Sequence, residues 1–145
     1  SKKAIERLRN IAASELMDGE PLIKDGEFGR KIAEVEIDLS ALEVTELRTL
    51  AAESKGQGPG PESSILKIKG TEIQQRITEL ALEAVGNYAF VYAPHGQEEG
   101  DNAFTPGPEY SIGVAQNYQN MRKTSIYGGS NEIQHNIIAK MVLGL

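Results

Sequence analysis

The chain has 145 residues, 39% of them hydrophobic and 25% charged, and a formal net charge of −6, which is typical of one globular domain of ordinary size. The negative charge, without any local basic stripe, makes nucleic acid and anionic membranes unfavourable partners, and no segment has the length of a membrane span. The absence of cysteine excludes disulfides and thiolate chemistry, so we expect the cytoplasm or an organelle matrix as the compartment.

Apolar residues recur at steps of three and four in the first third of the chain, which is the spacing of amphipathic helices. The first predicted helix covers residues 4–17 and ends at Asp18-Gly19. The second covers residues 27–54, with charged residues largely on its other face. Because the sequence starts inside a helical pattern, we expect residues 1–145 to be one domain whose first helix is truncated at its N-terminus.

A glycine- and proline-rich break at residues 56–61 precedes the third predicted helix. That helix runs from about Ser63 to Val85 and is stopped by Gly86-Asn87. Gly70 inside it costs roughly 1 kcal/mol relative to alanine, so it either permits a close contact between helices or is merely tolerated.

Residues 88–110 form a long irregular segment that contains five aromatic residues among prolines and glycines. A segment of this length and composition is rarely an idle linker. We expect a lid packed over one end of the molecule, with a substrate-channel or partner-facing loop as the alternative. His95 in this segment is expected to be solvated. Because His95 and His135 lack a metal-ligand spacing, no metal site is predicted.

The last third predicts a short helix around residues 109–123, a glycine-rich turn and a final helix that reaches the C-terminus. Long alternating runs typical of strands are absent from the sequence, and so are internal repeats. The predicted fold class is therefore all-α, an antiparallel bundle of four main helices with a long irregular loop before the last ones.

Gly128-Gly129-Ser130-Asn131 immediately precedes the final helix. Two glycines let the backbone turn tightly and approach a ligand closely, and Ser130 or Asn131 can cap the first helical amides. Free amides at a helix N-terminus suit a phosphate or a thioester oxygen. On these four residues alone, an ordinary turn with a helix cap is the commoner explanation.

The longer stretch from Arg122 to Gln134, with residues 136–140 and 142–145, strongly resembles the C-terminal signature of acyl-CoA dehydrogenases. The similarity extends to Ala33-Glu34, to the Gly-Pro-Gly-Pro-Glu turn at 58–62 and to residues 80–86, whereas 88–110 matches least.

The resemblance implies a C-terminal four-helix bundle that follows an N-terminal helical domain and a central β-domain. Members of the family bind FAD and desaturate an acyl-CoA between its α and β carbons. A carboxylate base removes the α proton while a hydride passes from the β carbon to the flavin, and an electron-transferring flavoprotein accepts the electrons. The bundles assemble into homodimers or homotetramers, in which each contributes to a neighbour's flavin site.

The catalytic base of the family does not carry over to this chain. Many members have a glutamate directly after the tyrosine of the signature, and the residue here is Gly128, which cannot take a proton. We therefore name no catalytic residue and expect the base outside the chain. Glu6 and Glu15 in the first helix are interpreted as solvated. The Gly128 N–H remains suited to the thioester carbonyl, where negative charge develops.

The resemblance assigns cofactor contacts to Gly86, Gly128, Gly129, Ser130 and Glu132. Ser130 and Glu132 match positions near the diphosphate and ribose of the flavin, although a glutamate beside a phosphate is repulsive unless it meets a hydroxyl or caps an amide. Residues 15–19 replace the family's Arg-x-x-Phe-Gly stretch with Glu-Leu-Met-Asp-Gly, and so lack the arginine that reaches a partner's flavin. Glu83 stands where the family has glutamine, and Gly86 is retained.

Three functions stay open at this point. The first is the C-terminal domain of an FAD-dependent acyl-CoA dehydrogenase, inactive alone and self-associating through its helices. The second is a non-catalytic helical oligomerisation or interaction module. The third is the flavin-binding subunit of a mixed dehydrogenase whose partner supplies the base.

Overall fold

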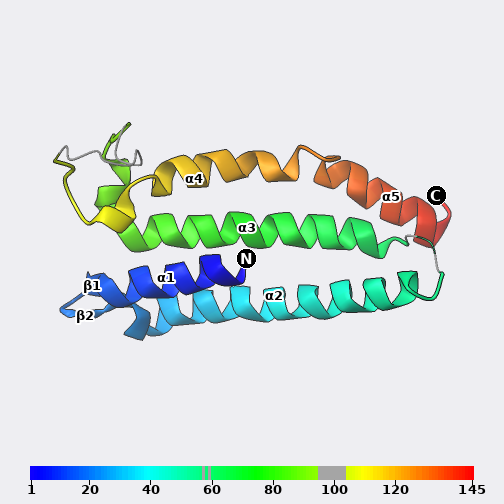
Figure 1. The fold of residues 1–145 in the computed structure, drawn as a ribbon, viewed down its shortest axis with the longest axis horizontal. Helices are drawn as coiled ribbons and strands as arrows, with labels where there is room; N and C mark the ends of the chain where they lie inside the picture. Colours follow the sequence, from blue (N-terminus) through cyan, green and yellow to red (C-terminus); the bar gives the residue numbers. More distant parts are fainter. Residues whose placement is uncertain (57, 59, 95–103) are drawn as a thin grey trace.

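The computed structural model describes residues 1–56, 58, 60–94 and 104–145. Its helices lie along one long axis and alternate in direction, with α4 and α5 following one another along α3 (Figure 1). The predicted all-α antiparallel bundle is confirmed, with the fourth helix divided in two. The α-helices are α1 (Lys2–Ser14), α2 (Gly26–Glu53), α3 (Glu62–Val85), α4 (Val114–Met121) and α5 (Asn131–Leu143). The short 3-10 helices are η1 (Leu22–Lys24), η2 (Gly86–Phe90), η3 (Glu109–Ser111) and η4 (Arg122–Ser125).

A small hairpin replaces the end of the first predicted helix. The prediction extended this helix to residue 17, but α1 ends at Ser14, and β1 (Leu16–Met17) pairs antiparallel with β2 (Glu20–Pro21). Asp18 and Gly19 between the strands have positive φ angles of 53° and 85°. Two positive φ angles are what a tight two-residue hairpin turn requires, and Asp-Gly is a preferred sequence for it. The pair therefore forms a hairpin as well as stopping the helix.

The hydrophobic core lies in the half of the bundle next to this hairpin. α3 is central and contacts each of the other four α-helices. Each large apolar side chain buried there contributes about 1.5–3 kcal/mol relative to full exposure. The core consists of Ile5, Leu8, Ile11, Ala12, Phe28, Ile32, Val35, Ile73, Ile77, Leu80, Ala84, Val85, Ala89 and Val114.

The opposite half of the bundle leaves apolar side chains exposed. α1 has 13 residues and α2 has 28, so α1 reaches only part of α2 (Figure 1). Leu47 and Leu50 near the end of α2 are exposed, and α5 has no fully buried residue. The exposed set includes Val44, Leu47, Leu50, Ile133, Met141 and Val142.

The expected lid is only partly present in the described residues of the 88–110 segment. Ala89 is buried, and the Tyr88 ring lies so close to Gly107 that a side chain there would overlap it. Phe90, Tyr92 and Phe104, in contrast, are 78–91% exposed. These three rings do not pack over the bundle. His95 lies outside the described residues.

None of the helices in the described part of the chain combines the length and the apolar character that crossing a membrane requires.

Candidate functional site

The glycine-rich turn connects η4 to α5 and requires both of its glycines. Gly128 and Gly129 have φ angles of 67° and 84°, in the left-handed region that is unfavourable for residues with a side chain. A Cβ atom at Gly128 would have no heavy atom within 4 Å, whereas one at Gly129 would lie 2.6 Å from Gln134 Nε2. The Gly128 position is thus open on the side where a side chain would project.

Three consecutive backbone N–H groups of this turn are available to a ligand. The amides of Gly128, Gly129 and Ser130 donate no hydrogen bond to the described part of the chain. Ser130 is the N-cap of α5, because its Oγ accepts a 3.4 Å hydrogen bond from Ile133 N. Of the two predicted caps, Ser130 rather than Asn131 therefore has this role. The free amides and the positive end of the helix favour an oxygen anion here.

The Glu132 carboxylate already has partners at the start of α5. Hydrogen bonding from the Ser130 hydroxyl, and then from the backbone amide of Glu132 itself, lowers the pKa of Glu132 below its ordinary value. The role of Glu132 near the flavin stays a prediction. The ionised carboxylate competes with any anion for the end of the helix.

A polar cluster on α3 holds the segment before the turn. The Gln75 Nε2 lies 3.2–3.3 Å from the carbonyl oxygens of Met121 and Arg122 and from two hydroxyls, those of Thr124 and Ser125. Arg122 Nη2 returns a 2.8 Å hydrogen bond to the Gln75 carbonyl. Thr124 is only 1% exposed, so η4 is fixed firmly against α3.

A second polar contact holds the segment after the turn. Lys67 Nζ donates a 2.8 Å hydrogen bond to Asn131 Oδ1, and the Thr71 hydroxyl lies 3.3 Å from the same amide oxygen. Sequence reasoning missed Lys67, Thr71 and Gln75. The signal was their four-residue spacing, which places all three on one side of α3 beside its apolar stripe.

Gly86 lies far from the turn. It ends α3 with a φ angle of 59°, nineteen residues after Lys67, which corresponds to roughly 28 Å along the helix. The neighbouring Glu83 forms an ion pair with Lys31. The five predicted cofactor residues therefore lie at two separate locations on the bundle, one at residues 128–132 and the other at Gly86.

Glu15 differs from its expected solvated state. The Tyr110 hydroxyl donates a 2.9 Å hydrogen bond to Glu15 Oε1, and burial, followed by this hydrogen bond, raises the pKa of Tyr110. The reason is the hairpin, which ends α1 at Ser14 and turns the next residue towards the 88–110 segment. Glu6, by contrast, is exposed as expected.

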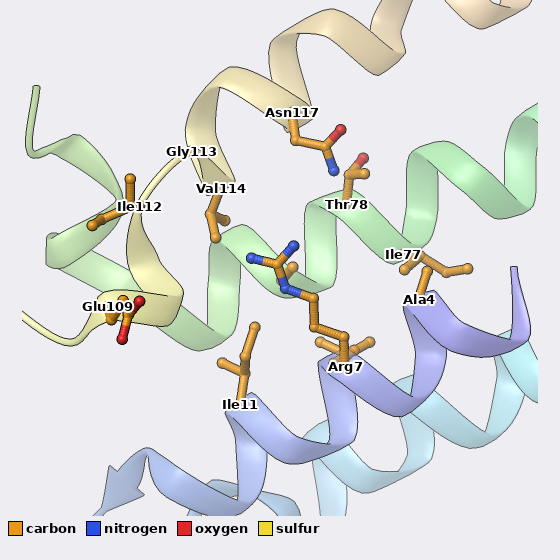
Figure 2. A pocket seen from close by; sticks show the side chains of 12 residues that line it. Ala4, Arg7, Ile11, Ile77, Thr78, Glu109, Ile112, Gly113, Val114 and Asn117 are labelled. Atoms are coloured by element: carbon orange, nitrogen blue, oxygen red, sulfur yellow. The ribbon is translucent and has the colours of Figure 1, made fainter. Parts of the chain in front are cut away.

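A cleft of about 510 Å³ lies between α1, α3 and the first turn of α4. Arg7 points into it from α1, and Asn117 faces it from α4 (Figure 2). The polar residues of the rim, Arg7, Glu109 and Asn117, are all exposed. Thr78 lies at the base of the cleft and also accepts a 3.3 Å hydrogen bond from Arg122. The cleft contains none of the predicted cofactor residues.

Residues 1–143 match the family model described as "Acyl-CoA dehydrogenase, C-terminal domain". The chain belongs to this family. The fold of the domain is shared with butyryl-CoA dehydrogenase from Megasphaera elsdenii, at 19% identity and a TM-score of 0.74 over 98% of this chain and 32% of that one. No curated protein matches the sequence.

Two further structures share the fold of this acyl-CoA dehydrogenase domain. One is the FAD complex of PigA, at 19% identity and a TM-score of 0.76 over 99% of this chain and 33% of that one. The other is the ChsE4-ChsE5 complex from Mycobacterium tuberculosis, at 23% identity and a TM-score of 0.72 over 99% of this chain and 35% of that one. The domain spans about a third of the length of each of these structures.

The chemistry that the Gly128–Ser130 turn offers in this acyl-CoA dehydrogenase domain is hydrogen-bond donation from its backbone amides. The Gly128–Ser130 amides fit an anionic oxygen of the kind found in a flavin diphosphate or a thioester enolate. Gly128 has no group that could take a proton. The carboxylate of Glu132, in the first turn of α5, has a lowered pKa, which makes it a weak base.

Proposed function

We propose that this domain is part of an FAD-dependent acyl-CoA dehydrogenase, in which it contributes the Gly128–Ser130 turn to the flavin and substrate site and is inactive alone. The observation that carries the proposal is the set of free amides in a turn whose sequence matches the family signature. FAD, when bound, supplies the acceptor for the hydride that leaves the substrate's β carbon. An electron-transferring flavoprotein is the proposed electron acceptor.

In this proposal the Gly128 N–H donates a hydrogen bond to the thioester carbonyl of the acyl-CoA. Negative charge develops on that oxygen as the α proton leaves, so a donor fixed beforehand stabilises the transition state more than the ground state. The Ser130 hydroxyl and the remaining amides hold an oxygen of the cofactor. The base that accepts the α proton lies outside residues 1–145.

The exposed apolar side chains of α2 and α5 support a homodimer or a homotetramer. Contiguous exposed apolar surface on a soluble protein usually marks an interaction site. The distance between Gly86 and the 128–132 turn supports contact with two different flavins. We also propose one domain for residues 1–145.

The flavin content of a longer protein tests this proposal. A polypeptide that extends residues 1–145 by the family's other two domains is purified and reconstituted with FAD. We expect a yellow protein with a flavin absorbance spectrum, while residues 1–145 alone stay colourless. A colourless longer protein that cannot be reconstituted would contradict the enzyme assignment and favour the interaction module.

A second candidate is the flavin-binding subunit of a mixed dehydrogenase, favoured by the missing carboxylate at Gly128. The ChsE4-ChsE5 structure, which contains a chain with this fold, is a complex. This candidate predicts that the longer protein binds FAD but reduces it with acyl-CoA only after a partner chain is added.

A further inference from the structure

We propose that Lys67 and Gln75 on α3 are positioning residues that set the location of the 126–130 turn, and with it the direction of the Gly128 N–H. This inference rests on the proposed function, because it concerns the turn that holds substrate and cofactor. Neither side chain lies in the turn itself. Both act through the segments on either side of it.

The turn has no apolar anchor of its own. Ile126 and Tyr127 are 69% and 56% exposed, and a Cβ at Gly128 would meet open space. Two left-handed glycines in succession give the backbone wide conformational freedom. Within the turn, the Gly128 carbonyl accepts a long, exposed hydrogen bond of 3.4 Å from Gln134 Nε2. The half-buried contacts that hold the turn in place lie at its two ends.

Gln75 fixes the end at which the chain enters the turn. Its side-chain amide has two N–H groups for four acceptors, all within 3.3 Å and all in residues 121–125. The hydroxyls of Thr124 and Ser125 also donate to the two carbonyls among these acceptors, so Gln75 is the donor that connects this hydrogen-bonded segment to α3. Loss of Gln75 would leave them without this donor in a half-buried place, which costs more than loss of an exposed hydrogen bond.

Lys67 fixes the end at which the chain leaves the turn. It is half-buried, and its ammonium group donates to Asn131, the first residue of α5. Lys67 and Gln75 lie two helical turns apart on the same side of α3, or roughly 12 Å. Because one rigid helix carries both contacts, α3 fixes the distance between the two ends of the turn.

The positive charge of Lys67 also affects the anion-binding end of α5. It is one of the charges that favour the ionised form of Glu132. Lys67 therefore offsets part of the negative charge that Glu132 places beside the free amides. A neutral residue at position 67 would weaken both the hold on Asn131 and the attraction for an anionic oxygen.

Hydrogen exchange of residues 1–145, followed by NMR, tests the positioning role independently of catalysis. The amides of Ile126 and Tyr127 donate to the Lys123 carbonyl and report on the entry to the turn. We expect Gln75→Leu to speed their exchange about tenfold, as for the loss of one net hydrogen bond. Lys67→Met should shift the Gly128 and Gly129 amide resonances, and Lys67→Arg should restore them.

The matched control is Lys69→Met, which removes a lysine of the same helix that pairs with Glu72 at the surface. The control should leave the exchange rates and shifts of the turn unchanged. If Gln75→Leu does not fold, the amide shifts of Lys67→Met alone test the proposal. Unchanged turn amides in the folded variants would overturn the proposal, as would equal shifts in the control.

A kinetic measurement on the FAD-loaded longer protein connects positioning with function. We expect Lys67→Met and Gln75→Leu to lower kcat roughly tenfold or more with a smaller change in KM, because a displaced donor acts mainly on the transition state. Lys67→Arg should recover most of the rate. Displaced turn amides with unchanged kcat would leave the positioning role intact and contradict the proposed function of the turn.

Discussion

Gly128 is the residue at which this domain departs most from its family's chemistry. It occupies the position where many acyl-CoA dehydrogenases have their glutamate, and its φ angle of 67° is one that glycine adopts without strain. The residue therefore offers a backbone donor in place of a side-chain base. In the proposed enzyme we therefore expect the base to come from another segment or another chain.

Ser130 connects the helix cap to the charge of Glu132, and this gives a prediction about pH. In Ser130→Ala we expect the pKa of Glu132 to rise towards its ordinary value, because the largest cause of its lowering is lost. Loss of the cap should also cost about 1 kcal/mol of stability. An NMR titration of the Glu132 carboxyl in both proteins measures the first effect, and urea denaturation measures the second.

The sign of the pH dependence follows from the lowered pKa. A carboxylate whose pKa is lower in the folded state stabilises the fold above its unfolded pKa, and this contribution is lost as the pH falls through the folded pKa. The stability difference between wild type and Ser130→Ala should therefore shrink as the pH drops below about 4.5. A difference that grows with acidification would show that Glu132 is not the group involved.

The sequence could predict the turn residues but not the residues that hold them. Gly128, Gly129 and Ser130 stand together in one recognisable stretch, and their local geometry follows from residue type. Lys67 and Gln75 act on residues 46 to 64 positions away. From the sequence alone, polar residues beside the apolar stripe of a helix are expected to contact water. Only the fold shows that these side chains contact a distant segment instead. Glu15 was misinterpreted for the same reason.

At the scale of the element, α3 carries a glycine that its packing does not require. A Cβ at Gly70 would lie 3.8 Å from Leu42 Cδ2, an ordinary van der Waals contact. We therefore expect Gly70→Ala to stabilise the domain by roughly 1 kcal/mol, through helix propensity and a small gain in packing. Urea denaturation measures the change. A destabilised variant would mean that α2 and α3 approach too closely here for a methyl group.

Local sequence patterns are sufficient to predict the ends of some helices but not of others. The bounds of α2 and α3 follow closely from apolar spacing and from the glycines and prolines between them, because each helix is long enough for its period to be unambiguous. The end of α1 could not be predicted from these local patterns. The same Asp18-Gly19 pair is compatible with a helix stop and with a hairpin turn, and only the pairing of β1 with β2 distinguishes them.

At the scale of the whole molecule, the apolar stripes exceed what one chain of this length buries. An apolar stripe has the same spacing whether the residues that bury it belong to this chain or to another one. The sequence therefore predicted the helices but not which of their apolar side chains stay exposed. Leu47 and Leu50 of α2 and most apolar residues of α5 are the result. This pattern is expected of a domain that packs against other domains or other copies.

We expect residues 1–145 to self-associate through this surface, because burial of apolar area drives association. Leu47→Glu should shift the equilibrium towards monomer, as measured by light scattering over a range of concentrations. Arg48→Ala is the matched control, since it changes the net charge equally without removing exposed apolar surface. A wild-type chain that stays monomeric at high concentration would contradict the prediction.

The most direct test of the central claim is the response of the bound flavin to substrate. The FAD-loaded longer protein is mixed anaerobically with a series of acyl-CoA thioesters, and the flavin absorbance is followed. We expect at least one thioester to bleach the flavin, and Gly128→Val, which disturbs the carbonyl donor, to slow the bleaching roughly a hundredfold. A protein that retains FAD but is bleached by none of the thioesters, or equally fast with valine at position 128, would contradict it.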